Sequence, residues 1–461
     1  MKVQFPRNHS ALAGNRLSRR YFFFGSLMAG AISTAGCGSA PSLKQAGFKS
    51  PNEKLNIAAI GAGGRGSTDI KECLTENIVA LADPDDVRAA ETYKQFLSVP
   101  KYKDFRRMFD KQEKEIDAVL VSCPDHTHGR AAMAAIVRGK HVYCQKPLTR
   151  TVWEARELAR AAVEHGVATQ MGNQGYSYED TRVCSEMIWS GAIGNVTEVH
   201  AWTVRPRTYW PQGPEVYPFG SPVPPALDWD VWLGGAEPRP FSPIYAPHGW
   251  RAFPDFGSGA IGDMACHILG DANMALRLAA PSSVECVRKE GTGLYTFPRK
   301  TTIRFDFPAR GTMPPVKIFW YDGVTEQPMI EGLPADESVG NPDLNGSLFV
   351  GDKGMLTAGC YGERPRLVPA SRMKEYQFPP PLLTRSPGHY RDWMRAAKGG
   401  EPACANFSVS APFVEWLLLG VIAMRCEGKL EWDRRSGQFT NSAHANQYLK
   451  PVFRKGWDFT A

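Results

Sequence analysis

Asp263 and His267 are the two residues whose types and spacing point most directly to proton transfer. They stand four residues apart in a run of small and apolar residues, Gly-Ser-Gly-Ala-Ile-Gly-Asp-Met-Ala-Cys-His. If the segment from Ala260 is helical, both side chains lie on one face. A carboxylate beside an imidazole orients the ring and raises its basicity, which suits a general base that removes a hydroxyl proton. The alternative is an ordinary helix pair facing solvent, which the small apolar neighbours disfavour.

Lys146 lies in a second candidate motif, Cys-Gln-Lys-Pro-Leu, which follows the predicted strand His141–Cys144. This places Lys146 at the carboxyl edge of a parallel sheet, where open α/β folds bind their ligands. A lysine there can donate to a substrate oxygen and stabilise an alkoxide that develops during oxidation. On this motif alone, a surface lysine before a proline turn is an equally good interpretation.

A third motif, Pro-Asp-His-Thr-His, follows another predicted strand, Ile116–Ser122, and contributes Pro124, His126 and His128. Two histidines separated by one residue could suggest a metal ion. No Cys, Asp or Glu partner completes such a site at ligand spacing, so the sequence predicts no metal. We expect these residues to pack beside a ligand and to start the next helix.

The elements that position these motifs begin with the buried strand at Leu55–Ile60, which breaks directly into a G-x-G-x-x-G loop. The first glycine allows a tight turn, the second a close approach to pyrophosphate, and the third close packing of the following helix. A second predicted strand, Asn77–Ala82, ends at an acid 22 residues after the first glycine, where a carboxylate can bind a ribose. The pattern predicts a dinucleotide site containing Gly61, Gly63, Gly64, Arg65, Gly66 and Asp83.

Two domains are predicted, because the pattern of strand-like and helix-like stretches changes along the chain. Residues 54–173 alternate strand-like and helix-like stretches, as a doubly wound parallel sheet requires. Residues 174–461 hold strands that alternate apolar and polar residues, typical of an antiparallel sheet, and a packed helix near Ala411–Cys426. Residues 203–256 are rich in Pro, Trp and Tyr and predict long functional loops.

The N-terminal 40 residues predict a targeting segment. Ser18-Arg19-Arg20-Tyr21-Phe22-Phe23 is a twin-arginine pattern, and a short apolar run follows it. Cys37 ends a lipoprotein-like box, so a lipid anchor there and cleavage after a small residue both remain open. We expect a signal segment over 1–40, a linker over 41–53, and an exported protein, periplasmic or attached to a membrane. Because residues 1–40 hold five basic residues and no acid, the rest has a formal charge of only +2, which does not suggest nucleic acid.

The glycine loop, the Lys-Pro turn and the Asp-x-x-x-His segment together resemble the Gfo/Idh/MocA family of oxidoreductases. The resemblance implies an α/β protein with an N-terminal Rossmann domain and a C-terminal α/β domain built on an open, largely antiparallel sheet. It implies that Lys146, Asp263 and His267 are catalytic and meet the nicotinamide of a bound cofactor, with Pro124, His126, His128, Gln145 and Lys146 beside the nucleotide. The family usually has Glu-Lys-Pro, so Gln145 removes a carboxylate next to Lys146.

The resemblance also implies a cofactor and a substrate class. Asp83 favours NAD over NADP because a carboxylate repels a 2′-phosphate, although Arg65 in the loop could partly offset this. The loop region suits a sugar or glycoside, because it contains aromatic rings and arginine side chains that can contact a pyranose ring. The function predicted is exported sugar oxidation with a tightly held, recycled NAD. Alternatives are an NAD-dependent glycoside hydrolase and a non-catalytic sugar- or nucleotide-binding protein. The resemblance also allows a homo-oligomer that forms through the open sheet. The residues of the loop region that could contact a sugar are Trp202, Arg205, Arg207, Tyr209, Trp210, Trp229, Trp232, Trp250 and Arg251. The acid–base candidates for a hydrolase are Tyr176, Tyr209 and His248.

Overall fold

The computed structural model describes residues 49–50 and 52–460 of the 461-residue chain. The predicted signal segment 1–40, the candidate lipid site at Cys37 and most of the linker 41–53 lie outside these residues. Within the described part, no helix combines the length and the apolar character needed to span a membrane.

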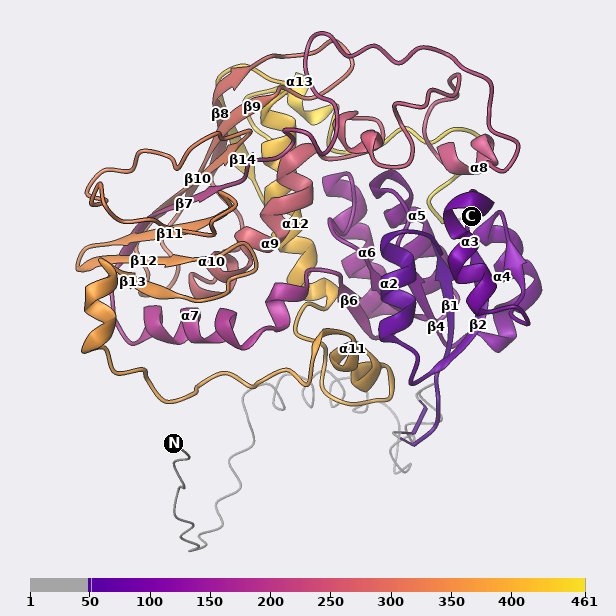
Figure 1. The fold of residues 1–461 in the computed structure, drawn as a ribbon, viewed down its shortest axis with the longest axis horizontal. Helices are drawn as coiled ribbons and strands as arrows, with labels where there is room; N and C mark the ends of the chain where they lie inside the picture. The colour runs from indigo at the N-terminus through magenta and orange to yellow at the C-terminus, as the bar shows by residue number, and fades with distance from the viewer. Residues whose placement is uncertain (1–48, 51, 461) are drawn as a thin grey trace, which may run out of the picture. The chain divides into compact units, whose positions relative to one another are not determined.

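A six-stranded parallel sheet forms the first part of the described chain, in the order β3-β2-β1-β4-β5-β6 (Figure 1). From β1 the chain first adds strands on one side of the sheet and then, from β4, on the other side. The position between β1 and β4 is the switch point at which such sheets bind ligands. The strands are β1 (Asn56–Ile60), β2 (Asn77–Ala82), β3 (Lys101–Tyr102), β4 (Ala118–Val121), β5 (His141–Cys144) and β6 (Thr169–Met171). The helices between and after them are α2 (Arg65–Glu72), α3 (Asp86–Gln95), α4 (Phe105–Gln112), α5 (Asp125–Ile136), α6 (Val152–Glu164) and α7 (Glu179–Trp189).

Both faces of this sheet are covered, which explains its continuous apolar strands. Ile57 and Ala59 face one core with α2, α3 and the later helix α11 (His389–Ala397). Ala58 and Ile60 face the other core with α4, α5 and α6. Trp393 of α11 is fully buried against the first face, so a distant segment of the chain completes the layer.

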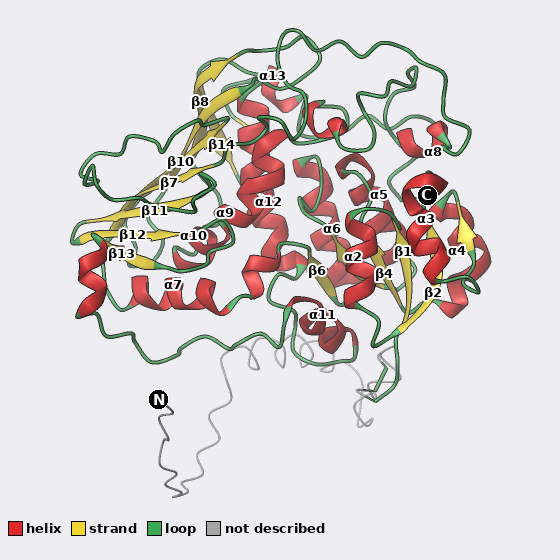
Figure 2. Cartoon of the chain, viewed as in Figure 1, coloured by secondary structure: helices red, strands yellow, loops and turns green. Residues whose placement is uncertain are grey.

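A nine-stranded sheet forms the second part, in the order β13-β12-β11-β7-β10-β9-β8-β14-β15 (Figure 2). Among the described strands, β7 and β10 pair in parallel and the other neighbours pair antiparallel. The predicted fold class, a doubly wound parallel sheet followed by a largely antiparallel one, is therefore confirmed. The strands are β7 (Val196–Trp202), β8 (Ser283–Glu290), β9 (Lys300–Phe307), β10 (Val316–Asp322), β11 (Gly346–Gly351), β12 (Gly354–Ala358), β13 (Arg366–Val368), β14 (Lys429–Asp433) and β15 (Gln438–Phe439).

Helix α12 (Phe407–Ala423) runs between the two sheets and packs on α6, β8 and β9 (Figure 1). The sequence predicted this helix over Ala411–Cys426, four residues too late at its start. It begins earlier because the side chain of Asn406 accepts a hydrogen bond from the backbone of Ser408 (3.0 Å) and caps the first turn. The remaining short helices are α8 (Trp229–Leu233), α9 (Cys266–Ile268), α10 (Gly270–Ala275) and α13 (Ala443–Asn446).

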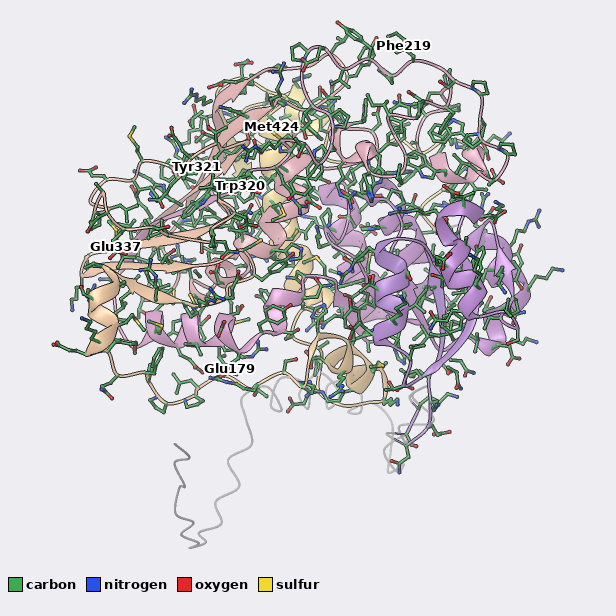
Figure 3. The ribbon with its side chains drawn as sticks, in the orientation of Figure 1. Glu179, Phe219, Trp320, Tyr321, Glu337 and Met424 are labelled. Carbon is green, nitrogen blue, oxygen red and sulfur yellow. The ribbon has the colours of Figure 1, made fainter. Side chains whose placement is uncertain are left out.

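Residues 203–256 form the long loops that the sequence predicts, interrupted by α8 and a single turn of 3-10 helix at Gly249–Ala252. Aromatic side chains of this segment pack into a small core of their own, in which Trp229 and Trp232 stack at 4.7 Å. The outer part of the segment carries Phe219, which is 76% exposed (Figure 3). Packing among these aromatic residues holds the loop in place without regular backbone hydrogen bonding.

Candidate functional site

A cleft of about 410 Å³ opens at the carboxyl edge of the parallel sheet. Pairing of Ile60 with Ala82 on one side and with Val121 on the other brings the ends of β1, β2 and β4 together. The predicted residues that line this cleft are Gly61, Gly63, Arg65, Asp83, Pro124, His128, Gln145, Lys146 and His267. The predicted residues that do not line it are Gly64, Gly66, His126 and Asp263.

The glycine loop has the close packing that its spacing predicts. Gly61 has a φ of +90°, and a Cβ on Gly66 would lie 1.9 Å from the carbonyl oxygen of Gly61. Helix α2 therefore begins tight against the end of β1, with Gly64 as its N-cap and without a side-chain cap. Uncapped backbone N–H groups at a helix N-terminus bind phosphate, so this end of the cleft fits a dinucleotide pyrophosphate.

Asp83 ties the end of β2 to the glycine loop. Its carboxylate accepts hydrogen bonds from the backbone of Ala62 (2.8 Å), Gly63 (3.0 Å) and Asp85 (3.0 Å). Burial raises the pKa of Asp83, and these N–H donors oppose the rise. The carboxylate still borders the cleft, at the place where an acid binds the ribose hydroxyls of NAD.

Arg88 is a cleft residue that sequence reasoning missed. It lies on α3, and its side chain packs over the loop, within 2.6 Å of a Cβ built on Gly63 and 2.3 Å of one built on Gly64. Its Nη2 atom lies 3.4 Å from Nε2 of His248 in the long loop segment. Its only signal in the sequence is a basic residue five positions after Asp83, too common a feature to single out.

Lys146, Asp263 and two arginines form an ion cluster beside the cleft. Lys146 Nζ donates to the carboxylate of Asp263 (2.8 Å) and to its backbone carbonyl (2.6 Å). Arg205 Nη1 donates to the other carboxylate oxygen, and Arg251 Nε lies 3.3 Å from the first. Burial opposes the charge on Asp263, but Lys146, Arg251 and Arg205 outweigh it and hold its pKa far below the ordinary value. Asp263 thus stays ionised and fixes Lys146.

The expected pairing of Asp263 with His267 is not what the structure shows. Residues Ile261–Ala265 form a π-helical turn, and α9 follows from Cys266. Hydrogen bonds one residue longer than those of an α-helix widen the turn, so side chains four apart no longer stack on one face. The carboxylate of Asp263 binds the three cations instead, and the described residues include no hydrogen bond between it and His267.

His267 nevertheless lines the cleft with Lys146. Its ring packs on Tyr361 at 4.6 Å, and its Nδ1 atom is buried without a hydrogen-bond partner among the described residues. Burial and the positive charge of Lys146 hold the pKa of His267 well below its ordinary value. The imidazole is therefore neutral and able to accept a proton. Tyr361 was also missed, because the sequence around it has no recognisable motif.

Gln145 has a carboxylate beside it after all. Its Nε2 atom donates to both oxygens of Asp69 (3.0 and 2.9 Å), a fully buried residue of α2. Asp69 also accepts from Ser122 Oγ (2.7 Å), Tyr390 Oη (2.7 Å) and Arg65 Nε (3.0 Å). A carboxylate from α2 thus contacts the side chain at position 145, and the same carboxylate holds Arg65.

The two histidines of the Pro-Asp-His-Thr-His motif hold loops in place. His126 Nε2 lies 2.9 Å from the carbonyl of Trp232, and its ring packs on Phe256. His128 Nδ1 lies 2.8 Å from the carbonyl of Pro147, and its Nε2 lies 2.8 Å from that of Cys123. A neutral ring has one N–H, and with that hydrogen on Nδ1 His128 holds the turn that carries Lys146. Burial lowers the pKa of each histidine to about 4.

The aromatic residues proposed to face a sugar divide into two groups. Trp232 and Trp250 line the cleft together with Arg205 and Arg251. Trp202 is fully buried at the end of β7, and Trp210 and Trp229 belong to the aromatic core of the loop segment. Of the acid–base candidates, His248 lines the cleft, whereas Tyr176 and Tyr209 do not.

Comparison with known proteins identifies the class. Residues 55–173 match the model of an "oxidoreductase family, NAD-binding Rossmann fold", and residues 192–288 match the C-terminal alpha/beta domain of such a family. Residues 55–173 thus match the NAD-binding domain of the Gfo/Idh/MocA oxidoreductases, the family that the motifs predicted, and residues 192–288 match a C-terminal domain of the same kind.

Individual relatives narrow the comparison. The chain is 27% identical to a levoglucosan dehydrogenase of Pseudarthrobacter phenanthrenivorans, over 42% of this chain and 40% of that protein. It is 31% identical to a glycosyl hydrolase family 109 protein of Solibacter usitatus, over 35% of this chain and 39% of that one. The chain therefore spans about two fifths of the length of the curated relatives it matches.

A solved structure shares the fold along most of the chain. The inositol dehydrogenase homologue of Azotobacter vinelandii, complexed with NADH and myo-inositol, aligns with a TM-score of 0.52. The alignment covers 84% of this chain and 100% of that one at 18% identity, which is a likeness of fold.

Proposed function

We propose that this protein oxidises a hydroxyl group of a sugar or glycoside and transfers the hydride to NAD. One observation carries the proposal: Lys146 and His267 line the same cleft as Gly61, Gly63 and Asp83. A proton acceptor and a positioned cation thus share a cavity with a loop suited to a dinucleotide. NAD supplies a hydride acceptor at its nicotinamide ring when it is bound.

The residues of the cleft have separate tasks in this reaction. Lys146, fixed by Asp263 at 2.8 Å, donates to the substrate oxygen and stabilises the negative charge that develops on it. His267, neutral at pH 7, accepts the hydroxyl proton. Gln145 and His128 hold the Lys146 turn through Asp69 and the carbonyl of Pro147.

A carbohydrate substrate is supported by the relatives and by the lining of the cleft. A levoglucosan dehydrogenase and an inositol dehydrogenase homologue are among the similar proteins. Trp232 and Trp250 offer aromatic surface for a ring, and Arg205 and Arg251 offer hydrogen-bond donors.

A glycoside hydrolase that oxidises, eliminates, hydrates and reduces is the second candidate. It is favoured by the similarity to a glycosyl hydrolase family 109 protein and by the additional groups His248 and Tyr361 in the cleft. Such a reaction needs one more acid or base than a simple oxidation, and either residue could supply it.

Export belongs to the same proposal. The twin-arginine pattern at Arg19 and Arg20 suits a protein that folds around its nucleotide in the cytoplasm before it is exported. Outside the cytoplasm no NAD pool replenishes the site, so we propose a tightly held and recycled cofactor. The protein would then lie in the periplasm or be attached to a membrane by a lipid anchor at Cys37. The second sheet would be the surface through which it forms a homo-oligomer.

The first experiment denatures the purified protein and identifies any released nucleotide. Sugars and glycosides are then added, and reduced nicotinamide and free sugar are followed together. Reduced nicotinamide in proportion to oxidised sugar supports the dehydrogenase, and free sugar without net reduction supports the hydrolase. A protein that neither retains nor binds NAD contradicts both and leaves a binding protein without catalytic activity.

A further inference from the structure

The cleft holds more positive charge than its own carboxylates neutralise. Lys146, Arg205 and Arg251 all lie around the single carboxylate of Asp263. The other acid lining this end is Asp125, whose pKa burial raises to about 7, so it is only partly ionised at neutral pH. The cluster therefore carries a net charge above +1 without its substrate.

Both arginines have donors to spare. Arg205 uses Nη1 for Asp263, and its Nε and Nη2 atoms have no hydrogen-bond acceptor among the described residues. Arg251 faces Asp263 through Nε, which leaves Nη1 and Nη2 without an acceptor in the same part of the chain. Each side chain is about one quarter exposed and lines the cleft.

Aromatic packing holds both guanidinium groups in place. Arg205 lies over the ring of Tyr209 at 4.2 Å, and Arg251 lies over the ring of Trp250 at 4.2 Å. A stacked guanidinium keeps its planar edge available, and two such edges match the oxygens of a carboxylate. An uncharged sugar has no group that would compensate this surplus charge.

We infer that the substrate is an acidic sugar, whose carboxylate is bound by Arg205 and Arg251 while its hydroxyl meets Lys146 and His267. This inference rests on the proposed sugar oxidation and adds the chemical class of the substrate. A carboxylate forms two parallel hydrogen bonds with one guanidinium edge, and a sugar phosphate, which can do the same, is the alternative that the test below separates from it.

Binding tests the inference separately from catalysis. Calorimetry on the NAD-loaded protein compares glucuronate with glucose, galacturonate with galactose, and both sets with glucose 6-phosphate. We expect each acid to bind at least about tenfold more tightly than its neutral counterpart, because hydrogen bonds to charged groups are the stronger kind. The affinity for the acid should also fall as salt is added.

Arg251→Gln should weaken the binding of the acid about tenfold or more and change that of the neutral sugar less than about threefold. Arg251→Lys keeps the positive charge but loses the planar pair of donors, so its affinity for the acid should lie between those of the wild type and Arg251→Gln. Arg239→Gln is the matched control, because Arg239 belongs to the same loop segment but pairs with Asp255 (2.7 Å) outside the cleft. Retained NAD in each variant shows that the fold is intact.

Equal affinities for acid and neutral sugar, a preference for the phosphate, or no binding of either acid would overturn the inference. Reduction of nicotinamide by neutral sugars alone would overturn it and leave the oxidoreductase in place. Tight binding of an acid without any reduction of nicotinamide would have the opposite meaning: the carboxylate site stands and the proposed oxidation fails.

Discussion

Two buried carboxylates, Asp83 in the lining of the cleft and Asp263 beside the cleft, are held in different ways. Asp83 is bound by three backbone N–H groups, and burial raises its pKa. Asp263 is bound by Lys146, Arg205 and Arg251, and these cations keep its pKa far below the ordinary value. Burial acts in the same direction on both acids, so the partners decide the outcome.

The difference follows from what each end must do. Backbone N–H groups at the glycine loop and at the start of α2 form a surface that fits the pyrophosphate of a dinucleotide. Side-chain cations at the Asp263 end form a charged surface that can orient a substrate and stabilise a developing negative charge. The first end therefore provides binding, and the second provides chemistry and specificity.

The largest effect is expected from Lys146→Ala, which should remove chemistry and leave binding. The rate of sugar oxidation should fall by about a hundredfold to ten-thousandfold, the range for a positioned proton donor or charge stabiliser. Nucleotide content after denaturation should stay unchanged, because the glycine loop does not depend on Lys146. Lys94→Ala, an exposed lysine that pairs with Glu91, is the control. Loss of nucleotide together with activity would show that the two ends are not separate.

Gly66→Ala should have the opposite effect and break the nucleotide end. The added Cβ would meet the Gly61 oxygen at 1.9 Å, so the loop must move away from the phosphates. We expect NAD binding at least about a hundredfold weaker, because several hydrogen bonds to charged oxygens are lost together. Gly220→Ala, where the nearest atom is a proline carbon at 3.2 Å, is the control. Normal NAD content in Gly66→Ala would refute the assignment of the loop.

The same contrast explains which parts were predictable from sequence. The glycine loop and Asp83 lie within one strand–helix–strand unit, so their spacing along the chain fixes their spacing in space. Strands β1, β2, β4 and β5 were predicted from their apolar runs and the sheet class was confirmed, whereas β3, which is two residues long, was not predicted. The predicted ends of helices differ from the observed ends by a few residues where a capping side chain sets the end. Asn406 does so at the start of α12.

The charged end could be predicted only in part. Lys146, Asp263 and His267 were found as motifs, and Arg205 and Arg251 as donors for a sugar. Their mutual contacts were not, because a π-helical turn replaced the expected α-helix at Ile261–Ala265. The partnership of Gln145 with Asp69 joins residues 76 apart, and no pattern in one sequence reveals such a contact.

Asp83→Asn should weaken NAD binding by about tenfold, because one oxygen cannot replace two as an acceptor from the loop and the ribose. The preference for NAD over NADP should also shrink, since the variant no longer repels a 2′-phosphate. Titration of both nucleotides measures this. Asp86→Asn removes the same charge three residues away, at an exposed side chain that pairs with Lys103, and should change neither affinity. An unchanged ratio of the two affinities would contradict the role of Asp83.

Asp125→Asn should have the smallest effect on function and tests how the charged end responds to pH. Asp125 accepts from Ser258 Oγ (3.2 Å) and is buried beside Lys146 and Arg251; burial raises its pKa from 3.8 to about 7. Below pH 7 it is therefore neutral, and its ionisation near pH 7 should change the oxidation rate a few-fold through its charge. The pH profile of the rate should lose this inflection in Asp125→Asn.

The free energy of unfolding gives the same test a definite sign. Between about pH 4 and pH 7 the folded protein keeps a proton on Asp125 that the unfolded chain has released. Stability from this group is thus present at low pH and lost as the pH rises through 7, by at most about 1.4 kcal/mol per pH unit. Urea unfolding at a series of pH values measures how the free energy of unfolding depends on pH. In Asp125→Asn the contribution of Asp125 to this pH dependence should be missing. The control Asp110→Asn, at a half-exposed side chain, should keep the pH dependence of the wild type. Identical slopes in the wild type and Asp125→Asn would mean that Asp125 is ionised like Asp263, and the contrast between buried carboxylates would then be confined to Asp83.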